Sequence, residues 1–231
     1  MRNALILCSG GLDSVTTAYF VKKKLKYNKI KMLFFNYGQR NLNAERRCSR
    51  RCALDLEAEF SEIPLEWLGD ISTSLLNSNE KTGELKRKDL KDTKKESDKW
   101  YVPCRNTIFL VYALALAESL YIKENEKYDI FSGFKCEGKE NYPDTTKEFV
   151  EEMNRLSKIS CIQKFKIIAP LIEKDKEDIV LLGQKLGVDF KKTFSCYTGE
   201  EIHCGTCLAC MLRKEGFYWA NVKDTTNYKD K

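Results

Sequence analysis

The sequence contains no long hydrophobic run. No window approaches the roughly 18 apolar residues that a membrane-spanning helix requires, so we expect no membrane span. The apolar run at residues 4–8 is too short for the core of a secretory signal, and it leads into glycines instead of a cleavage site. Together these absences predict a cytoplasmic protein with no membrane partner.

Basic stripes interleaved with aromatic residues are also absent, and so are internal repeats. The 40 basic and 34 acidic residues give a net charge of +6, but the two signs are interspersed, which is typical of solvated surface. We therefore expect no direct contact with nucleic acid. A length of 231 residues and a hydrophobic content of 42% suit one domain with a sizeable core, which we place at 1–231.

Cysteine, in contrast, is abundant. In a reducing compartment, ten cysteines do not indicate a disulfide framework. Six of them are scattered, and we interpret most of these as small core residues. The six are Cys8, Cys48, Cys52, Cys104, Cys136 and Cys161.

The remaining four cysteines form a cluster with the pattern C-x7-C-x2-C-x2-C, made by Cys196, Cys204, Cys207 and Cys210. Four thiolates at such spacings make a closed tetrahedral site, which indicates structural zinc. An iron–sulfur cluster could use the same ligands, but nothing else in the chain indicates electron transfer. Uncoordinated cysteines are the third interpretation. His203, the only histidine, is interpreted as a non-ligand, and we expect the tail at 193–217 to fold around Zn²⁺.

Strand-like and helix-like segments alternate along most of the chain, which predicts an α/β fold with a parallel sheet and crossover helices. Apolar runs predict five strands, at 4–8, 29–39, 60–68, 128–134 and 165–171. Helical patterns predict helices at 12–25, 40–57, 106–121, 145–158 and 174–186, the last with Gly187 as its C-cap. A polar, Lys-rich loop at 77–99 interrupts the alternation, and a mobile lid and a plain solvated loop both fit it.

The first predicted strand ends in the sequence Ser9-Gly10-Gly11-Leu12-Asp13-Ser14, and a helical pattern begins at once. Glycines let the backbone approach an anion, and the free amides and dipole of a helix N-terminus then hold it. The loop lacks the lysine of the Walker motif and the third glycine of the dinucleotide fingerprint. It therefore indicates a different phosphate-binding loop, and the alternative is a capped Gly-Gly turn with no ligand.

This loop resembles the pyrophosphate loop of the ATP pyrophosphatases, whose fold is a Rossmann-like parallel five-stranded sheet of adenine-nucleotide α-hydrolase type. The superfamily splits ATP between its α and β phosphates and transfers AMP to an oxygen. The resemblance implies that the loop binds ATP through Cys8, Ser9, Gly10, Gly11, Leu12, Asp13 and Ser14, with Asp13 near Mg²⁺. It also implies adenine contacts at Asn36, Tyr37, Gly38 and Gln39, although Asn-Tyr-Gly is an ordinary turn as well.

The loop and the cysteine cluster together are similar to the 7-cyano-7-deazaguanine synthase family. The segments "YVPCRNTIFL" at 101–110 and "LACMLRKEGF" at 208–217 add further matches. The resemblance implies that ATP adenylates the carboxylate of 7-carboxy-7-deazaguanine, that ammonia displaces AMP to give an amide, and that a second ATP leads to the nitrile. It also implies a homodimer.

The resemblance implies catalytic roles for Asp13 and Ser14 of the loop and for Arg105. Arg105 is the candidate for stabilising negative charge, because a guanidinium suits phosphate and carboxylate oxygens. The alternative for Arg105 is a surface salt bridge. Substrate contacts are implied for Arg105, Asn106, Gly133, Lys135, Tyr142 and Asp144.

The match departs from the family in two places. Cys104 stands where the family usually has glycine. Lys135 stands for asparagine, Gly138 for an acidic residue, and Thr145-Thr146 for Cys-Arg. The adenylation half is thus intact, while the substrate half is altered.

Three hypotheses are compatible with these departures. The first is sequence drift around the same substrate. The second is a paralogue that joins the activated deazaguanine to another amine, such as a protein N-terminus, as in antiviral gene clusters in which relatives of the family occur. The third is a nucleotide-binding module without catalysis, which the retention of Asp13 and Ser14 disfavours.

Overall fold

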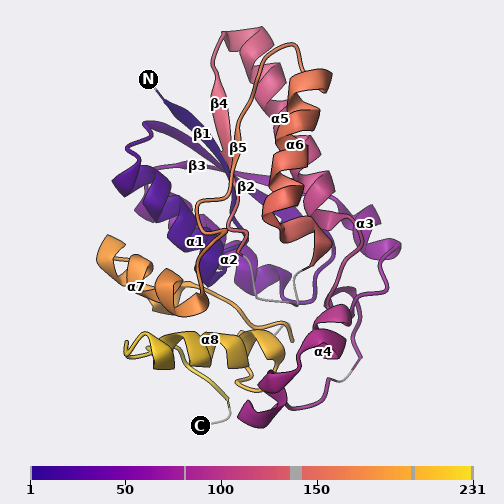
Figure 1. Cartoon of the computed structure of the whole chain (residues 1–231), viewed down its shortest axis with the longest axis vertical. Helices are drawn as coiled ribbons and strands as arrows, with labels where there is room; N and C mark the ends of the chain where they lie inside the picture. Colours follow the sequence, from indigo (N-terminus) through magenta and orange to yellow (C-terminus); the bar gives the residue numbers. More distant parts are fainter. Residues whose placement is uncertain (1, 81, 136–141, 199–200, 230–231) are drawn as a thin grey trace.

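The computed structural model describes residues 2–80, 82–135, 142–198 and 201–229. A five-stranded parallel sheet forms the centre of the molecule, with strand order β3-β2-β1-β4-β5 (Figure 1). Its strands are β1 Asn3–Leu7, β2 Lys29–Asn36, β3 Glu59–Pro64, β4 Tyr128–Phe131 and β5 Ile167–Ile168. The predicted α/β fold class with a five-stranded parallel sheet is confirmed.

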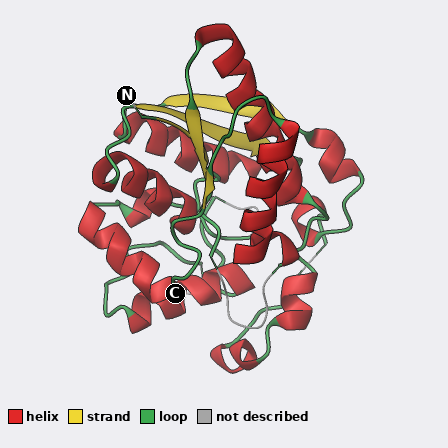
Figure 2. Ribbon diagram, turned by 45° about the horizontal axis from the view of Figure 1, so that its top comes forward, coloured by secondary structure: helices red, strands yellow, loops and turns green. Residues whose placement is uncertain are grey.

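Helices cover both faces of this sheet (Figure 2). Successive side chains of a strand point to opposite faces, so Ala4 and Ile6 of β1 belong to one core cluster, whereas Leu5 and Leu7 belong to the other. The first cluster includes residues of the helices α1 (Leu12–Tyr19), α2 (Leu42–Asp55) and α7 (Lys176–Leu186), and the second includes residues of α5 (Arg105–Glu124) and α6 (Lys147–Ser160). Because both faces are covered, the inner strands are continuous apolar runs, as parallel sheets require.

The longer helices are α1 Leu12–Tyr19, which continues as the π-helix η1 Phe20–Lys24, α2 Leu42–Asp55, α5 Arg105–Glu124, α6 Lys147–Ser160, α7 Lys176–Leu186 and α8 Leu208–Trp219. Short helical segments are α3 Glu66–Asp70, α4 Lys94–Asp98 and the 3₁₀ turns η2 Leu75–Asn77, η3 Arg87–Lys91, η4 Pro143–Thr145 and η5 Phe190–Lys192. Gly187 follows α7 with φ of 74°, so its prediction as the C-cap is confirmed.

Several predicted boundaries are wrong. The third strand ends at Pro64, and the residues predicted to extend it form α3 instead. The fourth and fifth strands are shorter than predicted, since β4 ends at Phe131 and β5 has two residues. Helix α8 was not predicted. In the Lys-rich loop, η3 and α4 form, and the Leu85 N–H donates to the Thr206 carbonyl at 2.9 Å, so part of the loop contacts the C-terminal tail.

Helix α5 requires a correction to the hydropathy argument. Its 20 residues are long and apolar enough to cross a membrane by length and composition alone, contrary to the expectation that no window comes close. In the structure the apolar residues Leu110, Ala113 and Ala117 pack in the second core cluster. A core helix passes the same test, and the third of this window that is buried packs against the sheet.

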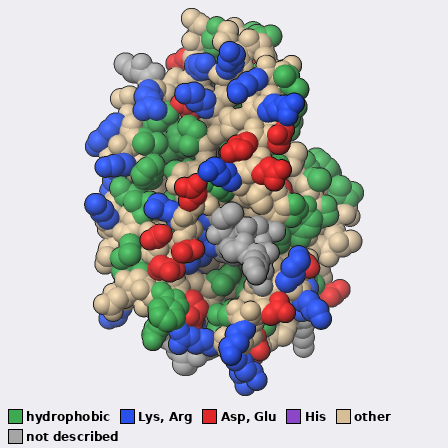
Figure 3. Space-filling view, viewed as in Figure 1, with side chains coloured by type: hydrophobic (Ala, Val, Ile, Leu, Met, Phe, Trp, Pro, Cys, Tyr) green, Lys and Arg blue, Asp and Glu red, His purple; other side chains and the backbone are tan. Residues whose placement is uncertain are grey.

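Surface charge follows the expected pattern. Basic and acidic side chains are interspersed over the face drawn in Figure 3. Of the scattered cysteines, which are mostly predicted to be core residues, Cys8 and Cys52 are buried in the core, Cys48 and Cys161 are partly buried, and Cys104 is an exposed exception. Cys136 lies outside the described residues.

Candidate active site and metal centre

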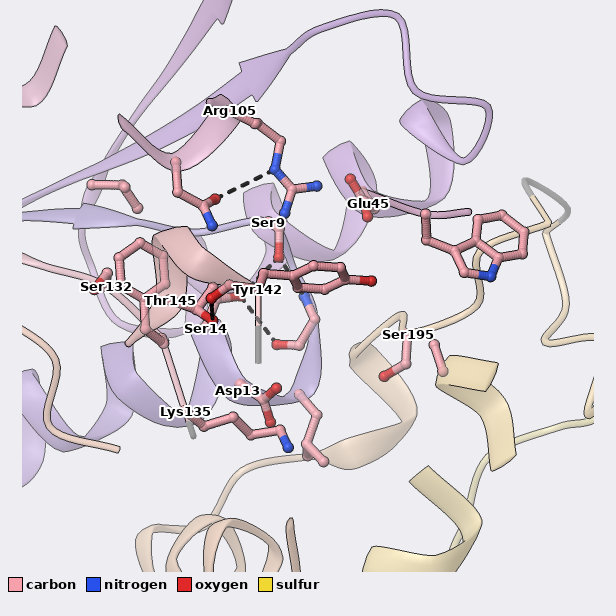
Figure 4. A pocket seen from close by; sticks show the side chains of 18 of the residues that line it. Ser9, Asp13, Ser14, Glu45, Arg105, Ser132, Lys135, Tyr142, Thr145 and Ser195 are labelled. Atoms are coloured by element: carbon pink, nitrogen blue, oxygen red, sulfur yellow. Dashed lines mark hydrogen bonds between the residues drawn. The ribbon is translucent and has the colours of Figure 1, made fainter. Parts of the chain in front are cut away.

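A cavity of about 310 Å³ opens at the carboxyl edge of the sheet. The strand order places β1 and β4 side by side, although their crossovers lead to opposite sides, and open α/β sheets bind ligands at such a switch point. The walls of the cavity come from the segments that follow β1, β2 and β4, from the starts of α5 and α7, and from the C-terminal tail (Figure 4). Segments far apart in the sequence therefore meet at one site.

The predicted phosphate loop forms part of this wall, and two glycines allow its close packing. Gly10 has φ of 82°, and a Cβ there would lie 2.6 Å from the Glu45 carbonyl oxygen and 2.8 Å from the Ser49 nitrogen. A Cβ on Gly133 would lie 2.9 Å from the backbone nitrogen of Ser14. Both positions therefore require glycine, which lets the loop lie against α2 and against the end of β4.

Hydroxyl groups and free amides converge at the start of α1. The Ser14 hydroxyl donates to the Gly11 carbonyl at 3.1 Å and lies 3.2 Å from the Ser9 hydroxyl. Gly11 is the N-cap and provides no side-chain cap, so the first amides of α1 have no intrahelical partner. The helix dipole adds partial positive charge, and the arrangement suits a phosphate group.

Two lysines supply the positive charge that the loop itself lacks. Lys176, the first residue of α7, places its Nζ 2.8 and 3.0 Å from the two carboxylate oxygens of Asp13. Both side chains are partly buried, with exposures of 18% and 26%. Lys135 follows β4, and its side chain extends toward Asp13 (Figure 4). Burial, together with the charge of Lys176, lowers the pKa of Lys135 to about 7.

Lys176 was missed by sequence reasoning. A lysine at the start of a helix does not stand out among 40 basic residues. One signal was available: Lys176 comes shortly after the fifth strand, and the carboxyl ends of parallel strands meet at the same edge of a sheet.

Arg105 lies at the start of α5 and lines the cavity. Its Nη1 donates to the Tyr37 hydroxyl at 3.2 Å and its Nε donates to the Asn106 side-chain oxygen at 3.3 Å. These partners are neutral and belong to the cavity wall, so they do not support the alternative of a surface salt bridge. Cys104, the N-cap, has φ of 54°. This left-handed conformation is one that glycine adopts without steric cost and that a residue with a Cβ, such as Cys104, adopts less readily.

Asn106 and Asp144 are held mainly by each other. The Asn106 N–H donates to Asp144 Oδ2, and its side-chain amide donates to the Asp144 carbonyl, both at 3.2 Å. Asp144 thereby caps the start of α5, and its side chain is buried. Tyr142 lines the cavity, and its hydroxyl donates to the Ser97 carbonyl at 2.9 Å.

The predicted adenine-binding turn stabilises itself through Gln39. This buried side chain accepts from the Tyr37 N–H at 2.9 Å and donates to the Phe35 carbonyl at 3.0 Å. Tyr37 is the member of the turn that lines the cavity.

The structure thus brings most predicted site residues to one cavity. These are Cys8, Ser9, Gly11, Leu12, Asp13, Ser14, Tyr37, Arg105, Asn106, Gly133, Lys135 and Tyr142. The remaining predicted residues do not line it: Gly10, Asn36, Gly38, Gln39 and Asp144. Of the departures from the family, Lys135 and Thr145 line the cavity, and Gly138 lies outside the described residues.

Glu45 is a second cavity residue that sequence reasoning missed. It belongs to the first turn of α2 and accepts hydrogen bonds from Asn41 Nδ2 at 2.8 Å and Gln39 Nε2 at 3.1 Å. Burial raises the pKa of Glu45 to about 7, although these amides and the charge of Arg105 oppose the shift. No local motif marks it, because glutamate in the first turn of a helix is ordinary.

The four clustered cysteines could hold a metal ion. The sulfur atoms of Cys196, Cys204, Cys207 and Cys210 all lie within 4.8 Å of one another. Backbone N–H groups point at these sulfurs: the Cys207 N–H lies 3.2 Å from Cys204 Sγ, and the Cys204 N–H lies 3.4 Å from Cys196 Sγ. His203 is not part of this group, and its Nε2 accepts from the Ser195 N–H at 3.0 Å.

The tail that carries these cysteines is tied to the phosphate loop. The Phe194 N–H donates to the Gly10 carbonyl at 2.9 Å, and Asn41 Nδ2 donates to the Cys196 carbonyl at 2.9 Å. Arg213 of α8 is 1% exposed, and its guanidinium donates to four oxygens at 2.9 to 3.1 Å. These belong to Phe190, Thr193, Ser195 and Thr226. The cysteine cluster and the cavity therefore form one connected structure.

A glycine loop that leads into a helix at the switch point of a parallel sheet, faced by lysine and arginine, is typical of nucleotide-binding α/β proteins. The family model described as "Queuosine biosynthesis protein QueC" matches residues 3–221. The chain belongs to this family.

Individual relatives agree with the family match. The chain is 37% identical over 232 residues to the 7-cyano-7-deazaguanine synthase of Rickettsia felis, which covers 99% of this chain and 100% of the relative. It is 34% identical over 233 residues to the enzyme of the same name from Methanobrevibacter smithii, with 99% of each chain covered.

The likeness to solved structures is weaker. The U34-tRNA thiolase NcsA from Methanococcus maripaludis, with its [4Fe-4S] cluster, has a TM-score of 0.48 and 15% identity, over 95% of this chain and 65% of that chain. A 4-thiouridine synthetase in complex with RNA and bound ATP has a TM-score of 0.47 and 15% identity, over 99% of this chain and 48% of that chain.

Proposed function

We propose that the chain is an ATP-dependent carbon–nitrogen ligase that adenylates 7-carboxy-7-deazaguanine, releases pyrophosphate and lets ammonia attack to form the amide and then the nitrile. The convergence of the Ser9–Ser14 loop with Lys176 and Arg105 on one cavity carries this proposal. A carboxylate is a poor electrophile until one of its oxygens becomes part of a leaving group. The site therefore has to stabilise the negative charge that builds on the phosphates.

Each side chain would have a definite part. The amides at the start of α1 and the hydroxyls of Ser9 and Ser14 would hold the leaving pyrophosphate. Lys176 would bind a phosphate oxygen, and Arg105 would bind the substrate carboxylate or the α-phosphate. The flat heterocycle would lie among the aromatic side chains of the cavity, which include Trp100, Tyr142 and Tyr197.

Two ions would complete the enzyme. Asp13 would hold the magnesium of the bound nucleotide, and that ion supplies neutralisation of phosphate charge. The four cysteines fit zinc: a tetrahedron with zinc–sulfur bonds of about 2.3 Å places its sulfurs about 3.8 Å apart. The Cys204–Cys210 and Cys196–Cys207 sulfur pairs are both separated by 3.9 Å. Zinc bound there would supply folding energy to the tail.

Mass spectrometry of one reaction tests the proposal. The purified chain, ATP, Mg²⁺ and 7-carboxy-7-deazaguanine are combined with and without ammonium. We expect AMP, pyrophosphate and the nitrile when ammonium is present. Asp13→Asn should abolish AMP formation, whereas Asp70→Asn, an exposed control in α3, should not. Absence of AMP from the unaltered chain would refute the proposal and favour a module without catalysis.

A second candidate keeps the activation step but changes the acceptor. Two positions that depart from the family pattern, Lys135 and Thr145, line the cavity, which supports a change in what the cavity accepts. An acyl-adenylate reacts with any well-placed amine, including a protein N-terminus. AMP and pyrophosphate without nitrile, together with a mass adduct on an added protein, would favour this candidate.

A further inference from the structure

The cavity contains a carboxylate to which the activation step assigns no role. Glu45 lies across the phosphate loop from Asp13 and faces the space beside Arg105 (Figure 4). Within the described part of the chain, no lysine or arginine nitrogen lies within 4.0 Å of its oxygens, whereas Asp13 is paired with Lys176. Glu45 is therefore a carboxyl group that faces the cavity without a direct ion-pair partner among the described residues, and the charge of Arg105 acts on it only from a distance.

Its position is fixed by neutral hydrogen-bond donors. Asn41 Nδ2 and Gln39 Nε2 each hold one carboxylate oxygen, at 2.8 and 3.1 Å. Each amide is anchored in turn, since Asn41 donates to the Cys196 carbonyl and Gln39 donates to the Phe35 carbonyl. A carboxylate held in this way keeps lone pairs for a ligand without losing side-chain entropy when the ligand binds.

The second half of the proposed reaction needs such a group. Ammonia is almost entirely protonated at neutral pH, and ammonium has no lone pair with which to attack an acyl carbon. A site that uses ammonium must bind a small cation and remove its proton. A general base works best when its pKa lies near the working pH, and burial raises the pKa of Glu45 to about 7.

We propose that Glu45 binds the ammonium cosubstrate in the cavity and accepts its proton, so that ammonia is formed beside the acyl-adenylate. This inference rests on the proposed function. The proton moves from ammonium to a Glu45 oxygen. The nitrogen lone pair then forms the C–N bond while the C–O bond to AMP breaks, and the phosphate oxygen takes the electron pair. The surplus nitrogen proton leaves on AMP, and Glu45 returns its own proton to water.

Hydroxylamine separates this role from a structural one, because it is largely uncharged at neutral pH and needs no base before it attacks. Glu45→Gln is compared with the unaltered chain and with Glu151→Gln, an exposed glutamate of α6. Three rates are measured: carboxylate-dependent exchange of pyrophosphate into ATP, amide formation with ammonium, and hydroxamate formation with hydroxylamine.

We expect Glu45→Gln to keep pyrophosphate exchange and hydroxamate formation within about threefold, and to lose amide formation by a factor on the order of 100, as removal of a general base does. Glu45→Asp, which keeps a carboxylate, should recover part of the loss. Glu151→Gln should leave all three rates unchanged.

Other outcomes would overturn the inference. Equal loss with both nucleophiles would make Glu45 structural, and an unchanged ammonium rate would exclude it as the base. If Glu45→Gln only raises the KM for the deazaguanine carboxylate in the exchange assay, Glu45 binds the N–H groups of the heterocycle and is not the base. If the unaltered chain shows no exchange, the proposed function itself fails, and this result is distinct from the others.

Discussion

Substitution of Gly10 by alanine should destabilise the chain, because two independent costs act at this position. The φ of 82° lies in the left-handed region, which costs a residue with a Cβ about 1 to 2 kcal/mol. The new Cβ would lie 2.6 Å from the Glu45 carbonyl oxygen and 2.8 Å from the Ser49 nitrogen. Both atoms belong to the backbone of α2, so no side-chain rotation relieves the contact, and overpacking adds about 1 to 3 kcal/mol.

The free energy of unfolding should therefore fall by about 2 to 5 kcal/mol, which lowers the Tm of a chain of this size by roughly 4 to 20 °C. Urea unfolding followed by circular dichroism measures the change. Gly83→Ala is the matched control, because its Cβ would meet no atom within 4 Å. If Gly10→Ala lies within about 0.5 kcal/mol of the unaltered chain, or if both variants lose equally, the steric reasoning is refuted.

Four further predictions concern the tail and the charged groups. Arg213→Lys should lower the free energy of unfolding by at least about 2 kcal/mol, as measured by urea unfolding. The reason is that hydrogen bonds from a charged donor contribute about 1.5 to 3 kcal/mol each, and lysine cannot reach the four acceptors that Arg213 binds. Chelation of the metal, or Cys207→Ser, should lower the Tm, whereas Cys161→Ser, which removes a cysteine outside the cluster, should not. Lys176→Met should weaken binding of ATP by roughly tenfold or more in calorimetry, and Lys185→Met, an exposed lysine of the same helix, should not. Burial raises the pKa of Glu45 from 4.5 to about 7, so the folded chain binds this proton more tightly than the unfolded chain does. The contribution of Glu45 to the free energy of unfolding should therefore fall as the pH rises from 4.5 to about 7. Urea unfolding curves of Glu45→Gln at several pH values should lack this part of the pH dependence.

The sequence by itself determined the class of fold and the two chemical centres. The alternation of apolar runs and helical patterns predicts a parallel sheet, because each period reflects a local geometry that does not depend on distant residues. The loop at 9–14 and the four cysteines are short motifs, so all of their ligand atoms are close in sequence as well as in space. For the same reason Gly187 was correctly predicted as a helix C-cap.

Only the tertiary structure decided which distant side chains share the cavity. Lys176 is 163 residues away from Asp13 in the sequence, and their pairing depends on how α7 is placed against the start of α1. Glu45 belongs to α2, and its pKa near 7 arises from burial in the assembled cavity, which no local pattern encodes. Strand ends were misjudged for a related reason: the apolar residues after Pro64 and around β5 are equally compatible with a strand, a short helix or a loop until their packing partners are fixed.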